Sequence, residues 1–391
     1  MIKEVCSSKK CIGCALCQNV CPKDAISIEL KDGFWRPSIS NKCIECGSCI
    51  RNCPINNKEK IEGYQTPDIV YAAWVKDDGI HHKSSSGGLA FKLSEWMINS
   101  GGFVVGIWFN IETQRVEHRI YEDISSLRLS QGSKYVSSYK GNIYKTVYES
   151  LKEKDGLFIG VPCEVFAMKQ YLSTKQDANL HSLFFIDTLC RGGSSPQLLK
   201  EQLSYVSRGK KVCNVTFRGG DNDCKFVAYG EGNKQLYLNG QYDDPYFSMF
   251  MKHITFQYEC FSCPFANSNR QGDITLADFW GLDKEIEKKT PIRGISMIMI
   301  DTSHGEKLFS NIRNELVVFE RPSVEAINGN DTLREATPMP TEYEKYWNLI
   351  NEKGFLKATK KMFKLDCNKH PIRFLYRKAR CIAARLLKGK K

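Results

Sequence analysis

From about residue 68 onward, the hydrophobic pattern alternates between strand-like and helix-like segments. Short β-rich or alternating apolar runs predict strands, and apolar residues three and four positions apart predict helices. The predicted strands are 69–75, 102–109, 115–121, 157–160, 183–187 and 295–301. The predicted helices are 89–98, 164–172, 196–206 and 307–312. Strands interleaved with helices are typical of a three-layered α/β domain, so we expect that fold here.

The pattern before residue 68 contains only short apolar stretches. Ile26–Leu30 and Phe34–Pro37 predict two short strands, and the Asp32-Gly33 turn signal between them favours a β-hairpin. The polar segment Asn56–Pro67 predicts a linker. The expected domains are a small α+β module at 1–60, a larger α/β domain at 68–320 and a C-terminal extension at 321–391.

Two cysteine runs flank this hairpin and share one spacing. They are Cys11, Cys14, Cys17 and Cys21, followed by Pro22, and Cys43, Cys46, Cys49 and Cys53, followed by Pro54. This is the spacing of bacterial ferredoxins, in which the fourth cysteine of each run ligates the cluster of the other run. It predicts two 4Fe-4S clusters with the ligand sets Cys11/Cys14/Cys17/Cys53 and Cys43/Cys46/Cys49/Cys21. Gly13 and Gly47 are expected to let the backbone bend around the sulfur atoms, and the chain is predicted to transfer electrons.

Structural zinc and disulfide bonds explain these runs less well. A zinc site needs two pairs of ligands and has no use for a third cysteine at the same step. The charged segment Met1–Val5 is not followed by the apolar region of a secretory signal. Seventeen cysteines without such a signal indicate metal binding rather than disulfide bonds, and a cytoplasmic location.

Length, composition and motifs narrow the function further. The chain has 391 residues, of which 42% are hydrophobic, as in a globular protein of two or three domains. Its apolar stretches are too short to span a bilayer. It has neither a Gly-x-Gly-x-x-Gly motif after a strand nor a Walker motif, which argues against a Rossmann NAD site and nucleotide hydrolysis.

The net charge of +12 is concentrated at the C-terminus. Residues 371–391 contain eight basic residues and no acidic one, which leaves +4 for the rest of the chain. Apolar residues at helical spacing in this tail predict a basic amphipathic helix. Such a helix either lies on an anionic membrane surface, docks on a partner or covers an apolar groove of its own domain. No nucleic-acid-binding module accompanies the charge, so no nucleic-acid partner is expected.

Four further cysteines follow strand ends or form a chelating pair. Cys163 follows the predicted strand 157–160, Cys190 follows 183–187, and both precede helices, where open α/β sheets place ligands. Cys260 and Cys263 form a C-x2-C pair. From spacing alone, a third cluster on these four residues and the burial of Cys163 and Cys190 as small apolar side chains are equally good explanations.

The segment 84–88, Ser-Ser-Ser-Gly-Gly, precedes the predicted helix at 89–98. Its hydroxyls and backbone amides suit a pyrophosphate group, although an ordinary helix N-cap explains the composition equally well. One-electron clusters need a two-electron partner to reduce an organic substrate, and flavin is the usual one. The segment is therefore a candidate flavin site.

Several motifs occur in an order that marks a family resemblance. They are Ser85-Ser86-Gly87-Gly88-Leu89, Gly132-Ser133-Lys134-Tyr135-Val136, Gly160-Val161-Pro162-Cys163, Cys190-Arg191-Gly192-Gly193, Phe217-Arg218 and the segment from Cys260 to Gly281. With them, residues 1 to about 315 resemble the beta subunits of coenzyme F420 hydrogenases and dehydrogenases, in the version with an N-terminal ferredoxin module. The segment from Cys260 to Gly281 is the most specific part of this resemblance.

The resemblance implies that the larger domain binds FAD and exchanges electrons with iron–sulfur clusters. It assigns an additional 4Fe-4S cluster to Cys163, Cys190, Cys260 and Cys263. It assigns flavin binding to Ser85, Ser86, Gly87, Gly88, Ser133, Lys134 and Tyr135. Relatives reduce a deazaflavin coenzyme, act as ferredoxin-dependent reductases of pigments, or look like accessory enzymes of surface-polysaccharide synthesis. Arg191 and the stretch after Arg218 depart from the family pattern, which leaves the substrate open.

We therefore expect an α+β ferredoxin-like dicluster module followed by a larger α/β flavin-binding domain. The predicted function is an iron–sulfur flavoprotein oxidoreductase that passes electrons between its clusters and FAD, to or from an organic substrate or deazaflavin. The alternative is a non-catalytic electron-transfer subunit of a larger oxidoreductase. The expected partners are a redox protein, such as a ferredoxin or an oxidoreductase subunit, and a small-molecule substrate. The oligomeric state stays open, a homo-oligomer included.

Overall fold

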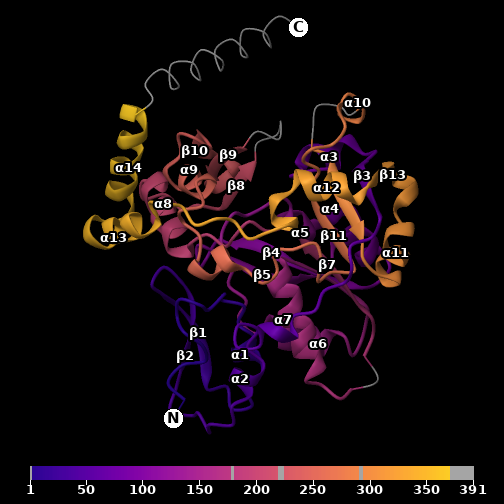
Figure 1. Cartoon of the computed structure of the whole chain (residues 1–391), viewed down its shortest axis with the longest axis horizontal. Helices are drawn as coiled ribbons and strands as arrows, with labels where there is room; N and C mark the ends of the chain where they lie inside the picture. The colour runs from indigo at the N-terminus through magenta and orange to yellow at the C-terminus, as the bar shows by residue number, and fades with distance from the viewer. Residues whose placement is uncertain (1, 178–179, 219–223, 290–293, 370–391) are drawn as a thin grey trace, which may run out of the picture. The chain divides into compact units, whose positions relative to one another are not determined.

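The computed structural model describes residues 2–177, 180–218, 224–289 and 294–369. The chain divides into two compact units, Met1–Met339 and Pro340–Lys391. The first unit contains both an N-terminal dicluster module and a larger mixed α/β domain (Figure 1).

The dicluster module is built around one β-hairpin and two short helices (Figure 1). The hairpin strands β1 (Ile26–Lys31) and β2 (Phe34–Ile39) are antiparallel. Asp32 and Gly33 between them have φ values of 51° and 83°, as a two-residue type I′ turn requires. The helices are α1 (Leu16–Asn19) and α2 (Ser48–Arg51). The predicted hairpin is therefore confirmed.

The α/β domain contains an eight-stranded sheet with the order β13-β3-β12-β11-β7-β6-β4-β5. Its strands are β3 (Ile69–Val75), β4 (Phe103–Asn110), β5 (Arg115–Tyr121), β6 (Gly156–Gly160), β7 (Leu183–Thr188), β11 (Ile274–Asp278), β12 (Ser296–Ile300) and β13 (Leu316–Pro322). β4, β6, β7 and β11 run parallel to their neighbours in that series, and the other pairs are antiparallel. The strands expected from the hydrophobic pattern are confirmed, whereas β11 and β13 were not predicted.

Helices cover both faces of this sheet, which confirms the three layers (Figure 1). They are α3 (Asp78–Lys83), α4 (Leu89–Asn99), α5 (Ile124–Leu127), α6 (Ile143–Ser150), α7 (Pro162–Ser173), α10 (Lys284–Glu287), α11 (Ser303–Ser310) and α12 (Ser323–Gly329). Because side chains alternate along a strand, neighbouring residues enter different cores. Val104 and Leu157 pack with α4 and α11, while Val105 and Phe158 pack with α6 and α7.

The start of α11 differs from the prediction of a helix over 307–312. The Thr302 hydroxyl accepts the backbone N–H of Gly305 at 3.1 Å and caps the helix, so it begins at Ser303. The predicted boundaries were wrong because the cap lies outside the apolar stretch from which they were derived.

A second sheet has three strands in the order β10-β9-β8 and was not predicted. Its strands are β8 (Asn214–Arg218), β9 (Cys224–Tyr229) and β10 (Gln235–Gly240), between the helices α8 (Pro196–Ser207) and α9 (Pro245–Met251). Phe217 and Phe226 pack against Tyr246 beneath this sheet. Most other positions in its strands are only half-buried or exposed, so their hydrophobic pattern is weak.

Several contacts attach the dicluster module to the α/β domain. In the predicted linker, Tyr64 forms an antiparallel bridge with Arg270, with N···O distances of 2.8 and 3.0 Å. The Trp35 indole N–H donates to the carbonyl of Ser137 at 2.9 Å. The Tyr144 hydroxyl on α6 donates to the carbonyl of Cys14 at 2.8 Å. The Tyr144 bond fixes the first cysteine run against α6, and the other two contacts fix the linker and the hairpin.

The second unit contains α13 (Tyr343–Lys353) and α14 (Phe355–Lys369). The hydroxyl oxygens of Tyr346 and Thr359 lie 2.8 Å apart between these helices. The predicted basic helix over 371–391, with its possible membrane contact, lies outside the described residues. Within the described part of the chain, every helix is too short or too polar to cross a membrane.

Candidate iron–sulfur and flavin sites

The two cysteine runs surround two cavities in the dicluster module. The inner cavity is lined by Cys11, Cys14, Cys17 and Cys53. The outer cavity is lined by Cys43, Cys46, Cys49 and Cys21. Each cavity combines three cysteines of one run with the fourth of the other run. This is the crosswise grouping on which the two expected ligand sets depend.

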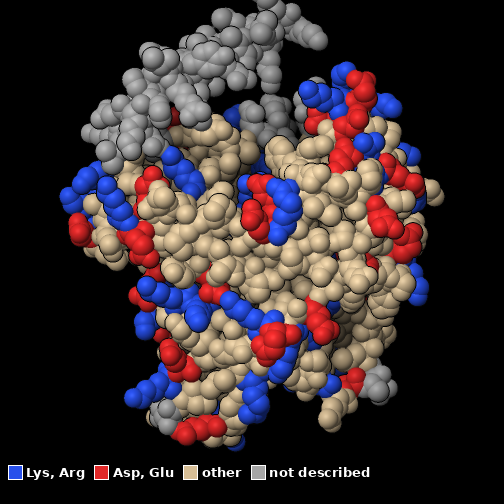
Figure 2. All heavy atoms as spheres, viewed as in Figure 1, with Lys and Arg blue, Asp and Glu red and all other residues tan. Residues whose placement is uncertain are grey.

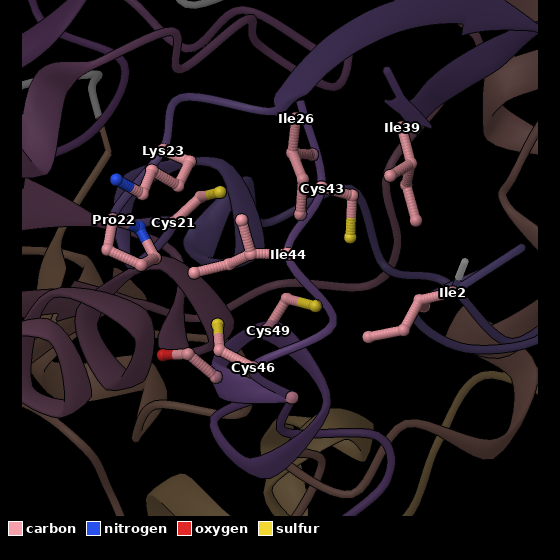
Figure 3. A pocket seen from close by; sticks show the side chains of 12 residues that line it. Ile2, Cys21, Pro22, Lys23, Ile26, Ile39, Cys43, Ile44, Cys46 and Cys49 are labelled. Atoms are coloured by element: carbon pink, nitrogen blue, oxygen red, sulfur yellow. The ribbon is translucent and has the colours of Figure 1, made fainter. Parts of the chain in front are cut away.

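Figure 3 shows the outer cavity, where the sulfur atoms of its four cysteines surround a common space. Ile26, Ile39 and Ile44 complete much of the lining. Cys46 is exposed, and Ile44 is 57% exposed. The outer cavity therefore lies at the protein surface.

The loops around both cavities have the same backbone form. In the first run, Gly13 and Ala15 have φ values of 66° and 61°. At the equivalent positions of the second run, Glu45 and Gly47 have φ values of 59° and 71°. The sequence predicted these bends at the two glycines and missed them at Ala15 and Glu45, which adopt a conformation that favours glycine.

A fifth cysteine, Cys6, also lines the inner cavity. A hydrogen bond with the Cys6 thiol lowers the pKa of Cys11 to about 6 and that of Cys53 to about 7. The same bonds raise the pKa of Cys6. Because Cys6 stands outside the ferredoxin spacing, sequence reasoning missed this contact.

Four more cysteines, here called the third cysteine set, gather in the α/β domain. They are Cys163, Cys190, Cys260 and Cys263. β6 and β7 are parallel neighbours, so the first two, which follow these strands, lie at one edge of the sheet. The other two are on and just after the 3-10 helix η4 (Tyr258–Ser262), where the Gly193 N–H donates to Cys260 Sγ at 3.4 Å. Cys190 interacts electrostatically with Cys260 and Cys263, and Cys163 does so with Cys190 and Cys263.

The chemistry of the third cysteine set fits an iron–sulfur cluster. Burial raises the pKa of all four thiols, so their ionised form needs a compensating positive charge such as cluster iron. Among the residues that the structure describes, no three His, Cys, Asp or Glu side chains are grouped closely enough to hold a single metal ion. A cluster differs from a single ion in this respect, because it holds its thiolates further apart.

Lys140 is a buried cation between the inner cavity and the third cysteine set. It interacts electrostatically with Cys14 on one side and Cys163 on the other. Its Nζ lies 2.8 Å from the Glu164 carboxylate. Although burial opposes ionisation, Lys140 and His118 hold the pKa of Glu164 well below its usual range. Lys140 and Glu164 therefore form a buried ion pair beside the third cysteine set.

Arg36 on β2 is a second buried cation in this region, with only 5% of its surface exposed. Its Nη1 donates to Gln257 Oε1 at 2.8 Å and to the Trp35 carbonyl at 3.1 Å. Its Nε has no hydrogen-bond partner among the described residues. Arg36 interacts electrostatically with Cys11 of the inner cavity and with Cys260 of the third cysteine set. A buried guanidinium of this kind fits anionic groups at both places.

The structure brings together the two segments expected to bind flavin. The Ser133 N–H donates to Ser85 Oγ at 2.7 Å. Gly87 lies so close to β3 that a Cβ atom there would be 2.3 Å from the Ala73 carbonyl oxygen. Gly88 has a φ of 86° and precedes α4. Ser86 Oγ is buried and has no partner in the described ranges, so it fits a phosphate oxygen at the N-terminus of α4.

The side chains of Lys134 and Tyr135, from the second of these segments, have other partners. Lys134 Nζ donates to the carbonyls of residues 130–132 at 3.4, 3.0 and 3.1 Å, and burial lowers its pKa to about 8. Tyr135 Oη accepts from Arg218 Nε at 3.1 Å, and its ring stacks on Phe250 with centroids 4.7 Å apart. Both side chains support the loop, so the Ser85–Gly88 segment offers the better fit to a flavin phosphate.

Comparison with known proteins identifies two matching families. Residues 154–325 match the family described as the C terminus of the coenzyme F420 hydrogenase/dehydrogenase beta subunit, and residues 10–57 match the 4Fe-4S dicluster domain. Among solved structures, the chain is similar to one chain of the xenon-derivatized F420-reducing NiFe hydrogenase complex from Methanosarcina barkeri. The identity is 17%, the alignment covers 77% of this chain and 92% of that chain, and the TM-score is 0.47. No curated protein sequence matches the chain.

Proposed function

Because the chain joins a 4Fe-4S dicluster domain to a domain that matches the C terminus of coenzyme F420 hydrogenase/dehydrogenase beta subunits, we propose that it is an iron–sulfur flavoprotein oxidoreductase. In this proposal, electrons pass between three 4Fe-4S clusters and FAD, to or from an organic substrate or a deazaflavin. When bound, the clusters exchange single electrons and FAD combines them into pairs. A role in surface-polysaccharide synthesis rests on the resemblance alone and forms no part of the proposal.

The observation that carries this proposal is the serial placement of three cysteine groups. The outer cavity is at the surface around Cys46. The inner cavity packs against α6 and α7 through Cys14. Arg36 and Lys140 each interact with one cysteine of the inner cavity and one of the third cysteine set. Such a series supports transfer of electrons from a partner at the surface to an acceptor in the α/β domain.

A short backbone path connects the third cysteine set with the proposed flavin segments. The Ser137 N–H donates to the Ser194 carbonyl at 2.9 Å, next to Gly193, whose N–H donates to Cys260 Sγ. The same loop reaches Ser85 through Ser133. This arrangement supports a flavin next to the third cysteine set, with Ser86 and the N-terminus of α4 holding the phosphates.

The surface around Cys46 supports a redox protein as the electron-transfer partner. Ile44 and Ile50 are 57% and 37% exposed on either side of this cysteine in the chain. On the face of the dicluster module seen in Figure 2, acidic and basic side chains are interspersed rather than gathered by sign. We therefore assign the partner contact to these apolar side chains rather than to a single-sign charge patch.

Anaerobic purification followed by counts of iron, sulfide and flavin tests the proposal. About twelve irons and one flavin per chain are expected, with four irons per cluster. A count of about eight irons would contradict the third cluster. Absence of flavin after reconstitution would contradict the reductase mechanism. The loaded protein should reduce a dye or a deazaflavin. A fully loaded but inactive protein would favour the alternative, a non-catalytic electron-transfer subunit of a larger oxidoreductase.

A pair of serine variants tests the flavin segment separately. Ser86→Ala removes the hydroxyl that has no partner among the described residues, so the flavin content of the purified protein should fall. Ser84→Ala is the matched control, because Ser84 Oγ already donates to the Ile80 carbonyl at 2.8 Å. Equal flavin content in the two variants would place the flavin phosphates elsewhere.

A further inference from the structure

Arg36 is a buried cation that lacks a carboxylate partner among the described residues. Two other buried cations have one: Lys140 pairs with Glu164 at 2.8 Å, and Arg270 pairs with Asp187 at 3.0 Å. Within the same described ranges, the hydrogen-bond acceptors of Arg36 are the neutral oxygens of Gln257 and Trp35, and its Nε has none. Burial of an uncompensated charge is unfavourable by several kcal/mol, so the fold needs a negative charge beside this guanidinium.

Cysteine ligands on two sides of Arg36 can supply that charge. Arg36 interacts electrostatically with Cys11 and with Cys260. Its acceptor Gln257 lies between the two: a Cβ atom on Gly13 would be 3.7 Å from Gln257 Oε1, and the Cys260 N–H donates to the Gln257 carbonyl at 3.0 Å. Cysteine ligates metal as the thiolate, so both neighbours are anionic when iron is bound.

We propose that Arg36 is a positioning residue for electron transfer. Its fixed charge raises the reduction potentials of the clusters held in the inner cavity and by the third cysteine set, relative to that of the cluster held in the outer cavity. A nearby positive charge favours the reduced form of a cluster, which carries one more negative charge. Arginine keeps its charge at every working pH, so no protonation change is involved. For the inner cavity the inference needs only the dicluster domain. For the third cysteine set it rests on the proposed function.

Lys140 does not have the same effect, although it lies between the same two sites. Glu164 neutralises its charge at 2.8 Å, and the Ser138 carbonyl accepts a second bond from its Nζ. Removal of Lys140 would also leave a buried carboxylate unpaired, which destabilises the fold. Arg36 is therefore the better position at which to change the net charge between the two sites.

A redox titration of the cluster-loaded protein, followed by electron paramagnetic resonance, tests this role. In Arg36→Gln, the midpoint potentials of the inner cluster and the third cluster should fall relative to the outer cluster. The expected shift in the one-electron equilibrium is about tenfold, equivalent to about 59 mV. Arg36→Lys keeps the charge and should recover most of the wild-type difference. The control is Arg119→Gln, which should leave all potentials unchanged. The Arg119 guanidinium lies over the Trp108 ring at 4.7 Å from its centroid.

A second variant keeps the test decisive if Arg36→Gln loses its clusters. Gln257→Glu replaces the amide by a carboxylate of nearly the same volume beside Nη1 and should lower the same potentials. Unchanged potentials in a loaded Arg36→Gln protein, or in Gln257→Glu where Arg36→Gln loses its clusters, would overturn the inference. Iron counts separate this result from failure of the proposed function. If the protein holds about eight irons and the potential of the inner cluster still shifts, the third cluster is rejected and the role of Arg36 at the inner cluster is retained.

Discussion

The inner and outer cavities of the dicluster module have the same cysteine pattern but different surroundings. At the inner cavity, Cys14 and Leu16 are buried among side chains of α6 and α7, and Cys6 and Arg36 add a thiol and a cation. At the outer cavity, Cys46 is exposed to solvent. Its neighbouring cation Arg51, whose Nη1 donates to the Cys46 carbonyl at 2.9 Å, is exposed as well.

This difference shows that ligand spacing and cluster environment are set by separate features of the chain. Spacing within a short loop determines which cysteines share a cavity. Contacts with distant segments determine how much water and which charges surround that cavity. Water screens Arg51, whereas a charge as deeply buried as Arg36 acts with little screening. We therefore expect the outer cluster to exchange electrons with a partner and the inner cluster to hold them.

Substitution of one cysteine ligand should give the largest difference between the two cavities, which is a difference in stability. Cys14→Ser and Cys46→Ser should each lose about four irons per chain. Cys14→Ser should also lower the free energy of unfolding by about 3 kcal/mol or more, because Cys14 is part of the core shared with α6 and α7. Cys46→Ser should cost less, since the Cys46 side chain is exposed and its loss leaves the core shared with α6 and α7 intact. Denaturant unfolding with parallel iron analysis measures both. Equal losses of stability would contradict the distinction between the cavities.

The fifth thiol should make the inner cavity more tolerant of ligand loss. In Cys11→Ser, Cys6 is already hydrogen-bonded at the position of the missing ligand and should replace it, so most iron is retained. Cys43→Ser in the outer cavity is the matched variant, because no fifth cysteine is among the described residues lining that cavity. It should lose its cluster. Iron content and the paramagnetic signal of the reduced protein measure the outcome, and the double variant Cys6→Ala/Cys11→Ser should lose the inner cluster as well.

Exposure to air should distinguish the cavities more weakly. Oxidation of cysteine follows its accessibility, so the outer cluster should decay several-fold faster than the inner cluster. The loss of visible absorbance should then have two phases. Cys46→Ser, which lacks the outer cluster from the start, should show only the slow phase. A single phase in the wild-type protein would mean that both cavities are equally accessible.

The sequence predicted the cysteines of the two cavities because ligands within a short loop have a fixed spacing. The third cysteine set needed a family resemblance, since its members come from three separate segments that only the folded sheet brings together. Arg36 and Gln257 are separated by 221 residues, and no local pattern connects them. Cys6 likewise lies outside any ligand spacing.

The predictions of strands succeeded or failed for the same reason, which is whether the signal is local in the sequence. Strands with strong apolar patterns, such as β4 and β7, were predicted. β11 was missed because polar residues interrupt it: Thr275 is fully buried yet donates to Asp301 at 2.9 Å. The three-stranded sheet β8–β10 was missed because its strands are largely half-buried. Hydrophobic patterns identify elements that bury apolar side chains. They fail for elements that bury polar side chains, because the hydrogen-bond partners of those side chains lie in distant segments.

The backbone of the two cysteine loops gives the smallest expected difference between the cavities. Gly13 and Glu45 occupy equivalent positions with φ values of 66° and 59°. Gly13→Ala should lower the free energy of unfolding by about 1 to 2 kcal/mol, because it strains this conformation and its Cβ would meet the Trp35 carbonyl at 3.2 Å. Glu45→Gly should relieve the same strain and raise stability by up to about 1 kcal/mol. Denaturant unfolding of the loaded protein measures both changes. If Glu45→Gly is destabilising instead, the Glu45 side chain contributes a contact that outweighs the strain of its backbone.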